Sequence, residues 1–241
     1  MVIHIYGYIM TKINNTKVLT FDLFGTILDL GGNLIPFIHE SFDVRDFKKI
    51  TADAFWEQWR HRQRIEQYQD TILMLGHSGY LEAVRRALHW TLRLNGIATS
   101  NDTVDEFMHG WQHLSPFPEV LPALERLKSE YKLVILSNGD PDFLDHLVMQ
   151  RVEWDFDNVI SVTSVGAFKP HPAVYRCAAG RLGLEVNECL MVSANSFDVM
   201  GARSCGYSGA YVNRYDLPYE DTHFQPDVTV NDFTELADAL L

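Results

Sequence analysis

The stretch VLTFDLFGTILD, residues Val18 to Asp29, decides the fold class of this chain. It is a short apolar run that ends on the carboxylate of Asp22, and a Gly-Thr turn follows at once. Four similar runs, KLVILS, NVISV, CLMVSAN and GAYVN, occur later, and helix-like stretches separate most of them. This alternation is typical of a parallel sheet built from βαβ units, so we predict an α/β fold.

One long region departs from this alternation. Between residues 32 and 115, apolar residues recur at helical spacing and no convincing strand is present. We therefore predict a helical domain, residues 32–115, inserted into a core domain formed by residues 1–31 and 116–241. The final segment, NDFTELADALL, is predicted to be a closing helix with Asn231 as its N-cap.

Composition limits the class of protein. The chain has 241 residues, of which 46% are hydrophobic and 22% charged, as in ordinary globular proteins. A net charge of -12 speaks against nucleic acid or an anionic membrane as a partner. No apolar run approaches the roughly 18 residues of a membrane-spanning helix. The cysteines Cys177, Cys189 and Cys205 form no CxxC pair, which indicates reduced thiols in a cytoplasmic protein. We give the first nine residues no role.

Polar residues follow several of the predicted strands. In an open α/β sheet, ligands bind outside the carboxyl ends of the strands. The residues at these positions are Asp22, Thr26, Ser137, Asn138, Lys169, Ser193, Asn195 and Asp198. Each one alone is more typical of a turn, a loop or a helix cap. Their coincidence at successive strand ends predicts a site with two carboxylates, one ammonium group and several hydroxyl and amide groups.

These segments resemble the four motifs of the haloacid dehalogenase superfamily. The matching segments are Asp22-Leu-Phe-Gly-Thr26, Ser137-Asn138-Gly139, Lys169-Pro170 and the segment from Ser193 to Asp198. The resemblance extends from about Val18 to the C-terminus. It implies a Rossmann-like parallel-sheet core with an inserted helical cap, and a covalent nucleophile at Asp22.

Two positions distinguish phosphatases from other members of this superfamily. In the phosphatases, a second Asp in the first motif protonates the leaving alcohol, and here that position is Phe24. Their fourth motif also supplies an earlier carboxylate that binds metal. Counting back from Asp198, that position is Ala194 or Ser193, and neither is acidic. Since magnesium prefers carboxylate ligands, we expect neither a metal nor another cofactor.

Both substitutions resemble the branch of L-2-haloacid dehalogenases. There an aromatic residue stands at the position of Phe24, and the fourth motif reads Ser-x-Asn-x-aromatic-Asp. The matching residues are Ser193, Asn195, Phe197 and Asp198. The resemblance implies metal-independent hydrolysis of short 2-haloalkanoic acids to 2-hydroxy acids through an aspartyl ester. A halide leaves as an anion, so no acid is needed at position 24. Phe24 and Phe197 replace the more common Tyr and Trp.

The same resemblance implies roles for the remaining core residues. Thr26, Ser137 and Lys169 would orient Asp22, and the ammonium group would also favour its ionised form. The hydrolytic water would be positioned or activated by Asp198 together with Ser193 and Asn195. The candidates for binding the substrate carboxylate are the backbone amides of Leu23, Phe24 and Asn138.

The predicted cap offers cations for the departing halide. The stretch QWRHRQRIEQY contains Arg60, Arg62 and Arg64, and the family arginine directly follows a Trp, which favours Arg60. Arg64 lies one helical turn further on and is the alternative. A run of charges is more often a solvated helix face. By approximate alignment, Tyr80 falls where the family places an aromatic residue near the halide, although a core or surface role explains it nearly as well.

Other functions stay open at this stage. The same nucleophile could open another small carboxylate electrophile, such as a cyclic amine carboxylate. A phosphatase with altered machinery is a second alternative. A degenerate binding module is a third, although the joint presence of Asp22, Lys169 and Asp198 speaks against it. The expected partner is a small carboxylate, and the resemblance makes a homodimer plausible.

Overall fold

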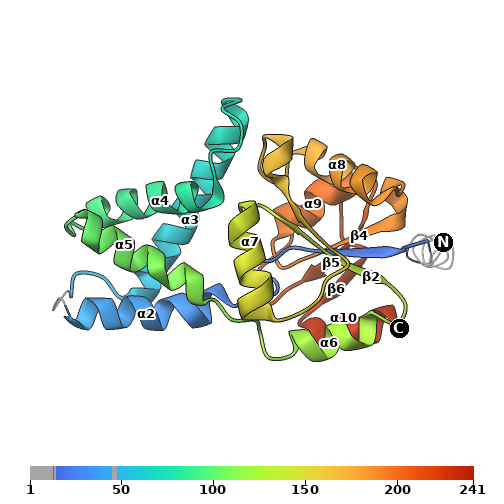
Figure 1. Ribbon diagram of the computed structural model, residues 1–241, viewed down its shortest axis with the longest axis horizontal. Helices are drawn as coiled ribbons and strands as arrows, with labels where there is room; N and C mark the ends of the chain where they lie inside the picture. The colour runs from blue at the N-terminus through green and yellow to red at the C-terminus, as the bar shows by residue number, and fades with distance from the viewer. Residues whose placement is uncertain (1–12, 14, 45–47) are drawn as a thin grey trace.

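A six-stranded parallel sheet forms the centre of the protein (Figure 1). The computed structural model describes residue 13, residues 15–44 and residues 48–241, so residues 1–9 lie outside it. The strands are β1 (Val18–Phe21), β2 (Lys132–Ser137), β3 (Asn158–Ser161), β4 (Cys189–Ser193), β5 (Ser208–Val212) and β6 (Val228–Val230). Their spatial order is β3-β2-β1-β4-β5-β6. The predicted α/β class is confirmed.

Strand β1 lies inside the sheet, between β2 and β4, and every one of its side chains is buried. It pairs with β2 on one side and β4 on the other, so that Val18 is level with both Lys132 and Cys189. The strand order reverses at this point, which is where α/β sheets open a crevice for ligands. Each of the five predicted apolar runs contains a strand. The sixth strand, β6, was not predicted, because a three-residue edge strand carries little hydrophobic pattern.

Helices occupy the chain between β1 and β2. The described α-helices before Pro116 are α2 (Leu30–Val44), α3 (Ala52–Ile72), α4 (Tyr80–Leu94) and α5 (Asn101–His109). Figure 1 shows them as a layer to one side of the sheet, and the described part of this region contains no strand. Buried aromatic rings fill its interior. Trp59 packs against Phe55 and Trp111, and its indole N–H donates to the carbonyl of Val84 at 2.9 Å.

The remaining helices cover the sheet. They are α6 (Val120–Leu127), α7 (Pro141–Leu147), α8 (Pro172–Leu182), α9 (Ser196–Ser204) and α10 (Phe233–Leu240). In Figure 1, α6 and α10 lie on one side of the sheet and α8 and α9 on the other. Asp232, not Asn231, caps α10, because its carboxylate accepts the backbone N–H of Glu235 at 2.9 Å. Among the described helices, none is both long and apolar enough to cross a membrane.

The helical layer is attached to the sheet edge by hydrogen bonds to α4 and α3. The carboxylate of Asp140, which follows β2, accepts the backbone N–H groups of Tyr80 and Leu81 at 3.0 and 3.2 Å. This is an N-cap interaction supplied from another part of the chain. Near the end of α3, the hydroxyl of Thr71 accepts the backbone N–H of Phe168 at 3.2 Å. These contacts hold the helices above the carboxyl ends of β1 and β2.

Candidate active site

Asp22 lies directly after β1, at the reversal of the strand order. Its Oδ2 atom accepts hydrogen bonds from the Thr26 hydroxyl at 2.9 Å and the Asn195 amide at 2.8 Å. Thr26 in turn accepts the backbone N–H of Ala194 at 2.9 Å, so its own proton is left for Asp22. Among the described residues, the other oxygen, Oδ1, has a single longer contact, 3.3 Å from the ammonium group of Lys169. One carboxylate oxygen thus accepts two short hydrogen bonds, and the other has only a weaker contact with an ammonium group.

Lys169 lies between two buried carboxylates. Its Nζ atom is 2.8 Å from Oδ2 of Asp198 and 3.3 Å from Oδ1 of Asp22. Its backbone N–H donates to the side-chain oxygen of Asn138 at 2.9 Å, which ties the β2 turn to the β3 segment. Burial raises the pKa of Asp198, and the nearby ammonium group opposes this rise. The three charges therefore depend on one another for their stability in the interior.

The two serines at the strand ends bind backbone and not Asp22. The Ser137 hydroxyl accepts the N–H of Gly139 at 3.2 Å, and the Ser193 hydroxyl accepts the N–H of Asn195 at 3.1 Å. No hydrogen bond in the described residues joins Ser137 to Asp22, so a role of Ser137 in orienting Asp22 stays a prediction. Hydroxyls bonded two residues ahead stabilise turns. Ser137 and Ser193 thereby fix the loops that carry Asn138 and Asn195.

Three backbone amides near Asp22 have free donors. Within the described chain, the N–H groups of Leu23, Phe24 and Asn138 have no hydrogen-bond acceptor. Leu23 and Phe24 are buried, and Asn138 is only 7% exposed. Unpaired N–H groups are rare in protein interiors and are typically satisfied by a ligand or water. These are the three amides that the sequence predicted for binding the substrate carboxylate.

Aromatic rings close the site next to Asp22. Phe24 stacks on Tyr80 from the start of α4, with ring centroids 4.1 Å apart and planes at 11°, and it also stacks on Phe143. The Tyr80 hydroxyl is buried and has no partner, and burial raises its pKa to about 12. The wall formed by Phe24 and Tyr80 is therefore apolar except for one hydroxyl group.

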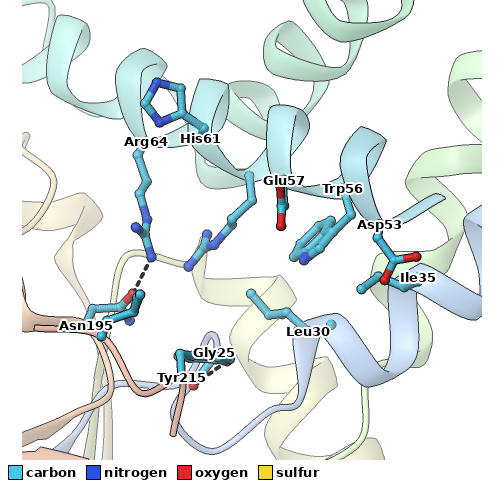
Figure 2. Close-up of a pocket in the computed structure, with 13 residues that line it drawn as sticks. Gly25, Leu30, Ile35, Asp53, Trp56, Glu57, His61, Arg64, Asn195 and Tyr215 are labelled. Atoms are coloured by element: carbon cyan, nitrogen blue, oxygen red, sulfur yellow. Dashed lines mark hydrogen bonds between the residues drawn. The ribbon is translucent and has the colours of Figure 1, made fainter. Parts of the chain in front are cut away.

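Helix α3 brings two arginines to the same cavity. Arg60 and Arg64 both line a small cavity of about 20 Å³ at Asp22. Arg60 donates to Gln63 of its own helix at 2.8 Å. Arg64 donates to the Asn195 side-chain oxygen at 2.9 Å (Figure 2) and lies 5.6 Å from the ring centre of Phe197. Burial and then Arg60 lower the pKa of Arg64 to about 10, so it remains a cation at neutral pH.

Comparison with known proteins identifies the family. The model of the haloacid dehalogenase-like hydrolases matches residues 16–206. The chain belongs to this family. It is 30% identical over 225 residues to (S)-2-haloacid dehalogenase H-109 of Pseudomonas putida, covering 92% of this chain and 97% of that one. An (S)-2-haloacid dehalogenase of Pseudomonas sp. (strain YL) is 33% identical, covering 88% of each. The crystal structure of an L-2-haloacid dehalogenase superposes with a TM-score of 0.85 at 26% identity, covering 93% and 98%.

The side chains of this hydrolase offer few ligands to a metal ion. The position two residues after Asp22 carries the stacked ring of Phe24, and the position four residues before Asp198 is Ala194. The remaining carboxylates, Asp22 and Asp198, are already paired with Lys169. Over the described ranges, no group of three His, Cys, Asp or Glu side chains is arranged to hold a metal. The donor set thus suits an ammonium group better than a divalent cation.

Two residues of the site were not predicted from the sequence. Tyr175 of α8 donates its hydroxyl to Oδ1 of Asp198 at 2.7 Å, and burial raises its pKa far above the usual value. Only its place on an inward helix face, six residues after Lys169, could have indicated it. Gln67 of α3 lines the cavity, and its buried Nε2 atom has no partner. Its spacing from Arg60 and Arg64, at seven and three residues, could have revealed it.

Proposed function

We propose that this protein hydrolyses 2-haloalkanoic acids to 2-hydroxy acids through an ester formed on Asp22. The observation that carries the proposal is the asymmetric environment of the Asp22 carboxylate. Oδ2 accepts two short hydrogen bonds, whereas Oδ1 has one contact at 3.3 Å. A carboxylate held by one oxygen presents the other as a nucleophile. The names of the relatives, (S)-2-haloacid and L-2-haloacid dehalogenases, agree with this chemistry.

In the first step, Oδ1 of Asp22 attacks the carbon that bears the halogen. A carbon–oxygen bond forms, the carbon–halogen bond breaks, and the halide leaves with the bonding electrons. The free N–H groups of Leu23, Phe24 and Asn138 bind the substrate carboxylate and hold the carbon in line. Phe24 fits this step because a halide needs no proton on leaving.

The cap arginine stabilises the departing halide. Arg60 suits this role better than Arg64, because its one hydrogen bond within the described residues is to the neutral side chain of Gln63. Arg64 is already bonded to Asn195, which itself holds Asp22. The unpartnered hydroxyl of Tyr80 lines the same cavity and can donate to the halide as well.

In the second step, water attacks the carbonyl carbon of the Asp22 ester. Asp198 takes the proton of this water, and a pKa raised by burial makes it a better base near neutral pH. The alkoxide of the hydroxy acid leaves and is protonated in turn, so that one oxygen from water stays on Asp22. Asn195 keeps the carboxylate in place, and Ser193 holds the Asn195 loop.

This assignment treats residues 32–115 as a cap over a core formed by residues 1–31 and 116–241. The homodimer suggested by the resemblance stays a prediction, which sedimentation velocity would test. The proposed substrate is a small carboxylate. The ammonium group of Lys169 and the guanidinium groups of Arg60 and Arg64 supply positive charge at the site.

The decisive experiment is turnover of L-2-chloropropionate in heavy-oxygen water without added magnesium. We expect chloride release, loss of activity in Asp22→Asn, and mass-spectrometric label in the peptide that contains Asp22. Chloride release without label would contradict the ester route. Absence of chloride from several haloacids, together with magnesium-dependent cleavage of p-nitrophenyl phosphate, would replace the proposal by a phosphatase.

A further inference from the structure

A second, larger cavity lies beside the Asp22 site. Its volume is about 420 Å³, compared with about 20 Å³ at Asp22. The two cavities share three lining residues, Arg60, Arg64 and Asn195, so they adjoin. A volume of 20 Å³ holds about one water molecule. The larger space, which we call the chamber, gives a substrate placed against Asp22 further room past the arginines.

The chamber has apolar walls supplied by the cap. Leu30 and Ile35 of α2 face Trp56 of α3 across it (Figure 2). Tyr215 lies on the core side, and its hydroxyl donates to the carbonyl of Gly25 at 3.0 Å, which leaves the ring to line the space. The volume lies within the range of small-molecule sites, which are mostly apolar with a few polar groups. Arg60, Arg64 and Asn195 lie where the chamber meets Asp22, and Asp53, Glu57 and His61 also line it.

Gly31 contributes to this open space. A Cβ atom there would lie 3.8 Å from Ile35 and 4.0 Å from the indole nitrogen of Trp56, which is ordinary van der Waals contact. The neighbouring Gly32 differs, because a Cβ atom would lie 2.1 Å from the carboxylate of Asp29. A side chain at position 32 would thus require the Asp29 carboxylate to shift, whereas one at position 31 would displace no described atom. A missing side chain at Gly31 leaves room in the chamber at some cost in helix propensity.

We propose that the chamber is the subsite for the substituent on C2 of the substrate, an alkyl chain of four or more carbons. The inference rests on the proposed function and extends its substrate range beyond the two- and three-carbon acids. With the carboxylate on the backbone amides and the halogen at Arg60, the alkyl chain passes Arg64 and contacts Leu30, Ile35 and Trp56. Each methylene buried against such walls is expected to raise kcat/KM up to about fourfold.

The test compares L-2-chloropropionate, L-2-chlorobutyrate and L-2-chlorohexanoate in the wild type, in Gly31→Leu and in Gly180→Leu. Gly180 is exposed on helix α8, with nothing within 4 Å of a Cβ atom, so it is a matched control. We expect kcat/KM to rise along the series in the wild type and the control. In Gly31→Leu, the ratio of the hexanoate to the propionate value should fall at least tenfold. An unchanged ratio of the hexanoate to the propionate value would overturn the proposal. That result is expected if the chamber is only an entry passage, because its narrowing would slow every acid equally.

Binding of halogen-free acids separates this inference from the proposed reaction. Hexanoate should bind more tightly than propionate in calorimetric titration and should change the fluorescence of Trp56, as judged against Trp56→Phe. Gly31→Leu should remove the advantage of hexanoate, while Gly180→Leu keeps it. If no haloacid releases chloride but this pattern holds, the reaction is wrong and the chamber stands. If both acids bind alike in the wild type, the chamber proposal is wrong whatever the reaction.

Discussion

The two sides of the catalytic cavity differ in how their polar groups are satisfied. On the core side, Asp22, Lys169 and Asp198 are bonded to one another and to buried neighbours. On the cap side, buried polar atoms of Arg64, Gln67 and Tyr80 have no partner. Leaving a buried donor unpaired costs about 1–3 kcal/mol. The charged side chains of the core side are therefore paired with one another, whereas the polar side chains of the cap side are complete only with a ligand.

Helix α3 shows the same contrast within one turn. Arg62 forms an ion pair with Glu66 at 2.6 Å. Arg60 and Arg64, which face the cavity, form no ion pair with any described residue. Like charges four residues apart on a helix repel each other. The cavity face of this helix therefore gives up stability that an anionic substrate restores.

The largest effect is expected from breaking the core side. Lys169→Met leaves two buried carboxylates without their cation, so we expect a loss of kcat of at least about a thousandfold and about 3 kcal/mol of stability. Chloride release measures the loss of kcat, and urea unfolding measures the loss of stability. Lys128→Met, which removes an exposed ion pair with Glu125, is the matched control and should cost under about 1 kcal/mol. Equal stability in both variants would contradict the coupled-charge description.

A smaller effect is expected on the cap side, and without a loss of stability. Arg60→Met should lower kcat/KM about a hundredfold, because one donor to the developing halide is lost. Its free energy of unfolding should stay within about 0.5 kcal/mol of the wild type, since an unpaired charge is removed. Arg62→Met should leave the kinetics unchanged. Loss of stability in Arg60→Met comparable with Lys169→Met would end the distinction between the two sides.

Tyr175→Phe tests the buried contact to Asp198. Removing the hydroxyl should lower kcat about tenfold, with little change in KM, because the base loses one orienting hydrogen bond. Tyr207→Phe is the matched control, since its buried hydroxyl donates to the carbonyl of Tyr175 at 2.8 Å and not to Asp198. Both variants should lose about 1 kcal/mol of stability. If kcat falls equally in both, the effect of Tyr175 is structural only.

The smallest effect is the pH dependence of stability. Burial raises the pKa of Asp198 in the folded state, so its contribution is most favourable below the unfolded pKa and is lost as pH rises through the folded pKa. Asp198→Asn lacks this titration. The stability of the wild type relative to the variant should therefore fall as pH rises from 4 through the folded pKa, in urea unfolding at constant salt. Exposed Asp142→Asn should show no such trend, and a trend of opposite sign would mean that Lys169 outweighs burial.

The local sequence pattern was sufficient to predict the charged residues on the core side of the cavity. Asp22, Lys169 and Asp198 each follow an apolar run or its turn, and parallel strands bring such positions to one edge. The sequence pattern was less reliable where it had to choose between two neighbouring residues or assign a partner to one side chain. Asn231 and Asp232 are both good N-caps, and only the backbone geometry selects Asp232. Ser137 has the position of an orienting group, yet its hydroxyl binds the nearer N–H of Gly139.

The sequence by itself determined the α/β class, the inserted helices and the residues at the strand ends, because strand and helix periodicity are local properties. Only the tertiary structure decided which atoms meet. Tyr175 reaches Asp198 from another helix, and Arg64 reaches Asn195 across 131 positions of sequence. The chamber was likewise invisible in the pattern. A hydrogen bond or a cavity depends on side-chain direction and on what neighbouring elements leave open, and packing alone sets both.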